Sequence, residues 1–295
     1  MIKQIVTIAA ALALGLIAGC GGGGSTPAAS ATVSGAVADG YLVGATVFLD
    51  KNGNYQLDAC EPSTTTDANG ACSLTVDPAD IGKYPIVAMA IKGQTIDKDT
   101  NQTVANNYLL SMPAIAVSGT VSSNFISPMS TLMREKMAAN PNMTMNDAIT
   151  QLRNQMNLQV GIDMMADYVA ASKSGTNAAQ YQTMHTTAQQ MAGVMAGQAS
   201  LVVNGSSVNL NRYRGMMATI NSNMTAIASN VTNGLDMNSA FMTGMMSQMQ
   251  TQLGVMSTTG GFVNYSGMFR NMTSHSSFWS NTGTPMTPMS GGMMK

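Results

Sequence analysis

The sequence predicts an α+β protein of two domains, in which an N-terminal antiparallel β-sandwich is followed by a methionine-rich α-helical bundle. Between residues 32 and 121, short runs of β-branched residues alternate with turn signals, and helical periodicity is missing. The second observation is the distribution of the 29 methionines, which are sparse before residue 110 and dense after it. We therefore place a β-sandwich domain at 32–121 and a helical domain at 127–256.

The candidate strands of the first domain are short and closely spaced. They cover residues 32–37, 44–49, 72–76, 85–91 and 114–121. Asp39-Gly40 and Asn52-Gly53 are turn-forming dipeptides between them. Several short strands at this spacing are typical of a small antiparallel sandwich.

The candidate helices begin at Ser127-Pro128, because serine caps a helix and proline fits its first turn. They cover residues 128–139, 144–158, 162–172, 177–201, 209–232 and 237–253. Apolar residues recur at three- and four-residue steps, as in Phe241, Met245, Met249 and Leu253. Such faces pack together into a bundle. Residues 257–295, rich in Ser, Thr, Gly, Asn and Met, are predicted to form a flexible tail.

The first 20 residues resemble a bacterial lipoprotein signal. Lys3 precedes an apolar stretch, which ends in Ile17-Ala18-Gly19-Cys20. The resemblance implies that residues 1–19 are removed and that Cys20 is lipidated, with residues 21–31 as a flexible tether. The expected location is the cell envelope, on the outer membrane, because Gly21 is not the aspartate that often signals inner-membrane retention. The alternative is an ordinary signal peptide with an incidental cysteine.

Two of the three cysteines remain once Cys20 carries lipid. In an oxidising compartment we expect Cys60 and Cys72 to form a disulfide. A short loop of this kind contributes roughly 3 kcal/mol in the chain-entropy treatment. A metal site is the rival interpretation, which we disfavour because no histidine lies near either cysteine in the sequence.

Three segments of the β domain carry a family resemblance. They are residues 33–37 (VSGAV), 43–49 (VGATVFL) and 65–70 (TTDANG). The stretch is similar to carboxypeptidase-regulatory-like and collagen-adhesin B-type domains, which are transthyretin-like β-sandwiches. The resemblance implies a stalk or spacer of a bacterial surface protein. A β module followed by Ser127-Pro128 and helices also resembles some bacterial surface lipoproteins.

Residues 50–61 have the ligand spacing of a twelve-residue calcium loop. Positions 1, 3, 5, 7, 9 and 12 hold Asp50, Asn52, Asn54, Gln56, Asp58 and Glu61. Similar loops occur in bacterial surface adhesins. Position 6, normally glycine, is Tyr55, which must adopt a costly backbone conformation or redirect the loop. We therefore expect calcium to bind weakly, with a dissociation constant of roughly 10⁻⁴–10⁻³ M. The alternative is a polar hairpin loop without a metal.

The methionines support a second hypothesis, because thioether sulfur is a soft ligand for copper(I) or silver. The helical candidates are Met184, His185, Met191, Met195, Met242, Met245, Met246 and Met249, and the tail candidates are Met286, Met289, Met293 and Met294. Methionine also fills irregular cores, and the helical candidates share stripes with Leu and Ala. We therefore expect core packing for the helical group. Soft-metal binding is the alternative function and falls mainly on the tail.

Other function classes find no support in the residues. Charged residues are 9% of the chain and the formal net charge is −1, so the sequence lacks a basic surface for nucleic acid. The two histidines, His185 and His275, have no recognisable partner motif for nucleophilic catalysis. We expect a non-catalytic envelope lipoprotein for adhesion, scaffolding or binding of a protein or polysaccharide partner.

Overall fold

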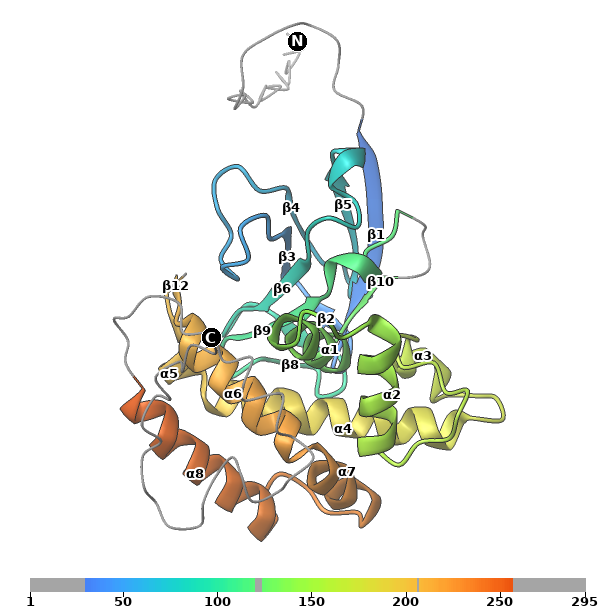
Figure 1. The fold of residues 1–295 in the computed structure, drawn as a ribbon, viewed down its shortest axis with the longest axis vertical. Helices are drawn as coiled ribbons and strands as arrows, with labels where there is room; N and C mark the ends of the chain where they lie inside the picture. The colour runs from blue at the N-terminus through green and yellow to red at the C-terminus, as the bar shows by residue number, and fades with distance from the viewer. Residues whose placement is uncertain (1–29, 120–123, 206, 257–295) are drawn as a thin grey trace, which may run out of the picture.

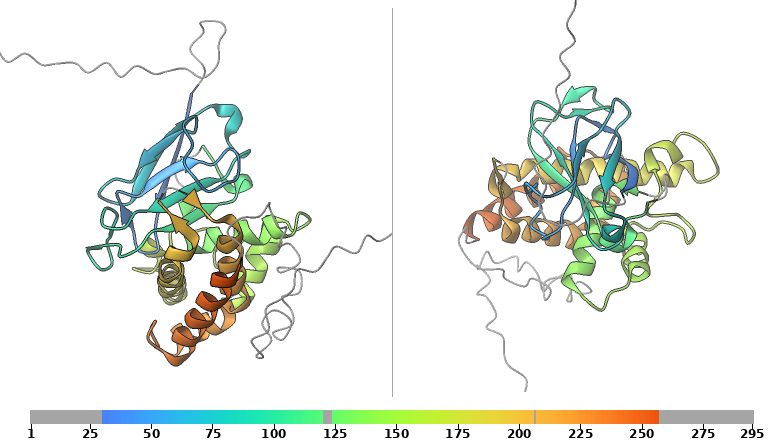
Figure 2. Two further views of the ribbon diagram at one scale, coloured as in Figure 1. Left: turned by 90° about the vertical axis from the view of Figure 1, so that its left-hand side faces the viewer. Right: turned by 90° about the horizontal axis from the view of Figure 1, so that it is seen from above.

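The computed structural model describes residues 30–119, 124–205 and 207–256. Several small sheets occupy the N-terminal part, and eight α-helices follow within the described residues. In Figure 1 the sheets lie above the helices, and β1 begins at the pole farthest from the helical part. The two further views in Figure 2 confirm that the sheets stack on a layer of helices.

Two sheets form the larger part of the β structure. The first has the order β10-β1-β5, with β1 Ala31–Val37 antiparallel to β5 Ala71–Val76 and parallel to β10 Asn124–Ile126. The second is antiparallel, with the order β4-β3-β6-β9, and consists of β4 Ser63–Thr65, β3 Thr46–Leu49, β6 Ile86–Ala90 and β9 Tyr108–Met112. In a smaller antiparallel sheet, β7 Ile96–Asp97 lies between β2 Leu42–Val43 and β8 Gln102–Thr103. A further antiparallel pair joins β11 Val203–Asn204 to β12 Ser207–Val208.

Four of the five predicted strands are confirmed within about two residues, and the fifth is wrong. Residues Ala114–Ala116 form the 3₁₀ turn η2 after Pro113. Proline has no N–H for a ladder, so the strand ends before it. The strand that pairs with β6 at this edge of the sheet is β9, and all of its residues are buried. Its sequence, Tyr-Leu-Leu-Ser-Met, lacks the β-branched residues by which the other strands were found.

The helical part follows the predicted order with shorter elements. The helices are α1 Pro128–Ala139, α2 Met145–Gln155, α3 Tyr168–Ala171, α4 Ala178–Gly197, α5 Ala199–Val202, α6 Leu210–Ser222, α7 Met224–Thr232 and α8 Ala240–Val255. A capping box at Ser127 starts α1, with its side chain accepting the N–H of Ser130. The predicted helix at 162–172 is reduced to α3, and two long predicted helices each divide, at Gln198 and at Asn223.

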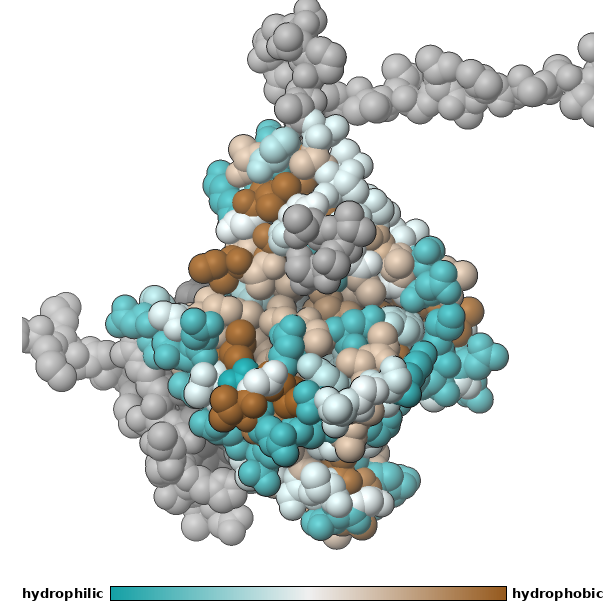
Figure 3. Space-filling view, turned by 90° about the vertical axis from the view of Figure 1, so that its right-hand side faces the viewer, coloured by the Kyte–Doolittle hydropathy of each residue, from teal (hydrophilic) through white to brown (hydrophobic). Residues whose placement is uncertain are grey.

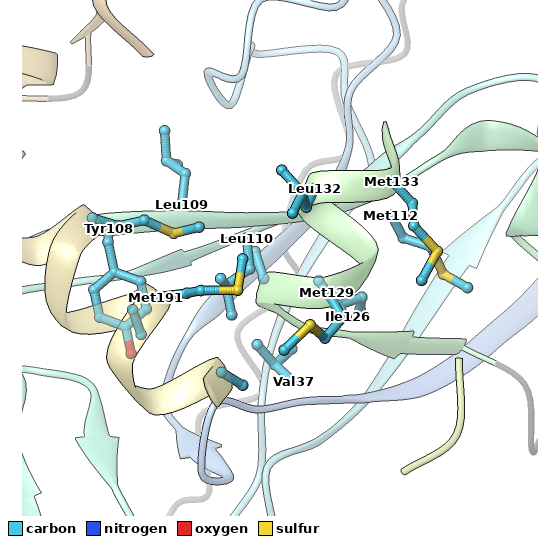
Figure 4. Packing of buried hydrophobic residues seen from close by; sticks show 14 of the residues in the cluster. Val37, Tyr108, Leu109, Leu110, Met112, Ile126, Met129, Leu132, Met133 and Met191 are labelled. Atoms are coloured by element: carbon cyan, nitrogen blue, oxygen red, sulfur yellow. The ribbon is translucent and has the colours of Figure 1, made fainter. Parts of the chain in front are cut away.

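The core is continuous from the sheets into the helices. Buried residues of both parts belong to one hydrophobic cluster. Figure 4 shows its centre, where side chains from β9 and α1 interleave with neighbours, among them Leu110, Leu132, Met129 and Met191. The predicted core packing of the helical methionines is confirmed for Met184, Met191, Met195, Met242, Met245 and Met249, which are at most 7% exposed. Met246 is partly exposed.

The surface is mixed in character. Figure 3 shows hydrophobic residues on one face as separate patches among hydrophilic ones. Exposed large hydrophobic residues in the described ranges are scattered along the chain and include Ile115, Val160 and Val255. None of the helices within the described ranges combines the length and the apolar character needed to cross a membrane.

Candidate functional site

A cleft of about 800 Å³ opens between the sheets and the helices. From the β part it is lined by Ala36, Tyr41, Asn69, Ala71, Lys98 and Asp99, and from the helical part by Asp167, Val169, Ser172, Lys173, Gln182 and His185. Both parts of the chain are therefore needed to form it. We call it the interface cleft.

A hydrogen bond between two lining residues of the interface cleft joins the two parts. Nε2 of His185, on α4, lies 2.7 Å from Oδ2 of Asp99, in the turn between β7 and β8. Gln189, one helical turn after His185, donates from its side-chain amide to the same oxygen, also at 2.7 Å. The hydrogen bond with His185 lowers the pKa of Asp99. These contacts hold both side chains in fixed positions at the cleft.

A second contact across the interface cleft joins Tyr41 to Asp167. The tyrosine hydroxyl donates to Oδ2 of Asp167 at 2.6 Å. Asp167 also caps α3, because its other carboxylate oxygen accepts the N–H of Ala170. Burial and the neighbouring carboxylate raise the pKa of Tyr41, so that its hydroxyl keeps its proton. The Tyr41–Asp167 pair therefore ties β2 to the start of α3.

A buried carboxyl group lies in the turn that leads into the interface cleft. Asp39 is 8% exposed, and its Oδ2 accepts a hydrogen bond from the hydroxyl of Tyr108 at 3.0 Å. Its Oδ1 is buried and has no hydrogen-bond partner in the described part of the chain. Burial, together with the charge of Asp97, raises the pKa of Asp39 to about 8. The neighbouring Gly40 lets the Asp97 and Asp99 carboxylates approach closely, because a Cβ there would displace them.

The calcium-like loop is closed by hydrogen bonds from the protein itself. The side-chain amides of Asn52 and Asn54 donate to Oδ2 of Asp58 at 2.7 and 2.9 Å. Glu61 accepts the backbone N–H groups of Lys51 and Asp58. The carboxylates that the sequence assigns to a cation are thus occupied by N–H donors. Gln56 belongs to the loop through its backbone N–H, which donates to Asn54 Oδ1.

Asp50, the first residue of this loop, pairs with an arginine instead. It is fully buried, and its Oδ2 lies 2.8 Å from Nη2 of Arg134 on α1. Its carboxylate also accepts the backbone N–H groups of Asn54 and Tyr55. The guanidinium of Arg134 supplies the positive charge that a cation would bring.

Tyr55 anchors the loop to the helices. Of the two alternatives expected at position 6, the structure has the costly one: Tyr55 adopts a left-handed backbone conformation, with φ of 63°. Its side chain is 1% exposed, and its ring centroid lies 4.6 Å from that of Tyr213 on α6 and 3.9 Å from the Arg134 guanidinium carbon. Its hydroxyl donates to Glu135 on α1. The burial of this large side chain offsets the backbone strain.

The described residues do not fit a calcium ion in this arrangement. No group of three or more His, Cys, Asp or Glu side chains within the described ranges is placed to hold a metal. A cation would have to displace Arg134 from Asp50 and two amides from Asp58. Calcium binding stays a prediction of the sequence, and the loop geometry favours the alternative of a metal-independent polar loop.

Calcium should therefore leave the stability of the protein unchanged. We expect no rise in Tm at millimolar calcium, because every loop carboxylate already has protein donors. Differential scanning calorimetry with calcium, compared with equal magnesium, tests this expectation. A calcium-specific rise in Tm that Asp58→Asn abolishes would restore the calcium site.

The cysteines, His275 and the tail methionines, which the sequence also singled out, do not form a site in the described residues. No disulfide joins Cys60 and Cys72 in the structure; Cys60 is exposed, whereas Cys72 lies buried in β5 opposite Gly35. Burial raises the pKa of the Cys72 thiol to about 11. The disulfide stays a prediction. Cys20, His275 and the tail methionines Met286, Met289, Met293 and Met294 lie outside the described residues.

Comparison with known proteins adds no assignment. Neither the protein-family models, nor the curated proteins, nor the solved structures contain a significant match to this chain. The function is therefore argued from the interface cleft and the sequence.

The sequence alone did not reveal the residues of the interface cleft. The sequence offers no partner motif for His185, and Asp99 lies 86 positions away in the chain. The one available signal was the scarcity of histidine, since the chain has only two. A scarce, titratable side chain on an otherwise neutral helix is a reason to look for its partner.

Proposed function

We propose that this chain is a non-catalytic, lipid-anchored protein of the bacterial cell envelope that binds an envelope polysaccharide through the interface cleft. The anchor rests on the lipobox resemblance at Cys20. The binding role rests on one observation, a cleft that two parts of the chain build together from fixed polar side chains.

The chemistry of the interface cleft suits a ligand rich in hydroxyl groups. Carboxylate, amide, hydroxyl and ammonium groups line it, while Ala36, Ala71 and Val169 add apolar surface. Such a mixture can donate to and accept from sugar hydroxyls while packing against the faces of sugar rings.

The arrangement favours binding over catalysis. Nucleophilic catalysis needs a hydroxyl or thiol within hydrogen-bonding reach of its base. Within the described ranges, the hydrogen bond of the His185 side chain goes to Asp99, and no hydroxyl or thiol is bonded to it. His185 therefore acts in this proposal as a positioning partner for Asp99.

The β part has a proposed role of its own in this function. We infer a transthyretin-like sandwich of the sheets β10-β1-β5 and β4-β3-β6-β9, serving as a spacer between the anchor and the helices. In support, Cys72, Leu74 and Val76 turn one face of β5 inward while alternate residues are exposed. The start of β1 at the pole opposite the helices suits an N-terminal tether.

Photo-crosslinking in cells that produce the chain tests the proposal. A photoreactive residue at Gln182 or Lys173, both exposed at the cleft, should yield a high-mass adduct that glycosidases degrade. Asn233, exposed on the turn after α7, is the matched control and should yield none. Adding Asp99→Asn should lower the yield. Equal adducts from all positions, or an adduct that only proteases degrade, would contradict polysaccharide binding.

Soft-metal sequestration is the alternative, and it now rests on the tail methionines. The helical methionines that were its other candidates are mostly core residues. Copper or silver in natively purified protein would favour this alternative.

A further inference from the structure

Residues 235–256, which we call the C-terminal segment, pack along α4 and α6 by a repeated contact. The segment contains α8, whose inward methionines Met242, Met245 and Met249 are at most 7% exposed. At its two ends and its middle, a further methionine lies against a glycine of the supporting helices. These three contacts differ in kind from the rest of the packing.

Each contact uses the missing side chain of a glycine. A Cβ on Gly193 of α4 would lie 3.0 Å from Cε and 3.2 Å from Sδ of Met237. A Cβ on Gly215 of α6 would lie 3.0 Å from Sδ of Met256. On Gly197 of α4 it would clash with the methyl group of Met246. The methionine ends therefore occupy notches with no room for an added methyl group.

Beside each notch, a side chain of the supporting helices holds a backbone carbonyl of the segment. Gln190 donates to the carbonyl of Leu235 at 2.8 Å, and Gln198 to that of Met246 at 3.1 Å. Arg212 donates to the carbonyl of Met256 at 3.0 Å. The C-terminal segment is thus fixed at three contact points, and each combines a hydrogen bond with a methionine packed on a glycine.

Within the C-terminal segment, the three notch methionines are more exposed than the other methionines. Met237, Met246 and Met256 are each partly exposed, in contrast to the buried methionines of α8. Oxidation of methionine follows exposure, so a dissolved oxidant reaches these thioethers first. The methionines that fix the segment are therefore also its most exposed methionine residues.

Oxidation would change these contacts directly. Hydrogen peroxide transfers one oxygen atom to the thioether; the sulfur loses two electrons and becomes a sulfoxide, and the peroxide is reduced to water. The new oxygen is polar and enlarges a side-chain end that already fills its notch. A sulfoxide cannot keep the same contact with the glycine backbone, so the segment separates from the supporting helix at that contact point.

We propose that Met237, Met246 and Met256 are oxidation sites that release the C-terminal segment from α4 and α6. The modification is reversible, because methionine sulfoxide reductases restore the thioether. The inference is independent of the interface cleft and of its ligand. It assigns a chemical role to three partly exposed methionines at the edge of the core.

Peroxide titration of the full chain tests the proposal. Peptide mass mapping should show sulfoxide at the three notch methionines before Met242, Met245 and Met249. Since each lost contact leaves a backbone carbonyl of the segment without its partner, amide hydrogen exchange in α8 should accelerate about tenfold or more. Exchange in β6 and α1 should stay unchanged. Treatment with methionine sulfoxide reductases for both sulfoxide epimers should restore slow amide exchange in α8.

A matched variant separates the notch sites from other oxidised methionines. The triple variant Met237→Leu, Met246→Leu and Met256→Leu keeps apolar volume without a thioether. Its α8 should keep slow exchange after the same peroxide treatment. Wild-type α8 that exchanges slowly although all three sulfoxides have formed would overturn the proposal. Because that readout needs no variant, it holds even if the substitutions weaken folding.

Discussion

Asp39→Asn should stabilise the protein strongly at neutral and alkaline pH. The buried Asp39 has one carboxyl oxygen without a partner, and Asp97 and Asp99 lie close enough to repel its charge. An asparagine at this position removes the repulsion, and its amide can donate toward the neighbouring carboxylates while its oxygen still accepts from Tyr108. The gain arises from an electrostatic penalty that the wild-type turn carries.

The sign of the effect follows from the two pKa values of the carboxyl group. Folding raises the pKa of Asp39 from its ordinary 3.8 to about 8. Below the lower value the group is protonated in both states, so it has no effect on stability. As the pH rises between the two values, the unfolded chain loses the proton while the folded chain holds it, and stability falls. The penalty is complete above the higher value and is on the order of 5 kcal/mol.

Urea unfolding from pH 4 to pH 9 measures this difference. The Asp39→Asn variant should match the wild type at the acid end and exceed it increasingly through neutral pH. The control is Asp163→Asn, an exposed position whose side-chain oxygen can still accept the N–H of Met165. Equal pH dependence of the Asp39 variant and the wild type would show that Asp39 carries no such penalty.

Local sequence signals predicted the elements that depend on local chemistry. Ser127-Pro128 marks the start of α1, because a capping box needs only residues within one turn. Pro113 ends β9, yet β9 itself was missed, since it forms through burial by α1 and the neighbouring strands rather than through β-branched residues. The burial of β9 comes from residues distant in the sequence, and no local pattern contains it.

The same limit applies to charged residues. Arg134, Glu135 and Lys136 form a charged run that is typical of a solvated helix face, but all three are buried. Burial lowers the pKa of Lys136 to about 8. Asp50 pairs with Arg134 and Tyr55 donates to Glu135, and both belong to a loop that the sequence predicted as a calcium site, whereas Lys136 donates to Gln151. The strained conformation of Tyr55 could be predicted from the loop spacing, whereas its arginine partner could not.

Arg134→Met should destabilise the protein by about 3–5 kcal/mol, because it leaves the fully buried carboxylate of Asp50 without its counter-charge. The variant also loses the contact between the guanidinium and the ring of Tyr55. Lys51→Met is the matched control, since it breaks the ion pair with Asp80 at a lysine side chain that is 37% exposed. It should cost less than about 1 kcal/mol.

A double-mutant cycle identifies the buried charge as the cause. In Asp50→Asn with Arg134→Met, both charges are gone, and the amide oxygen of residue 50 can still accept the N–H of Asn54, whereas the amide NH₂ replaces the oxygen that accepted the N–H of Tyr55. We expect the double variant to lose roughly 1–3 kcal/mol less than the sum of the losses of the single variants Asp50→Asn and Arg134→Met, and this difference is the interaction free energy of the pair. Recovery stays partial because Arg134 also lies near Glu135 and contacts Tyr55. Additive losses in chemical denaturation would mean that Arg134 stabilises the loop by packing alone.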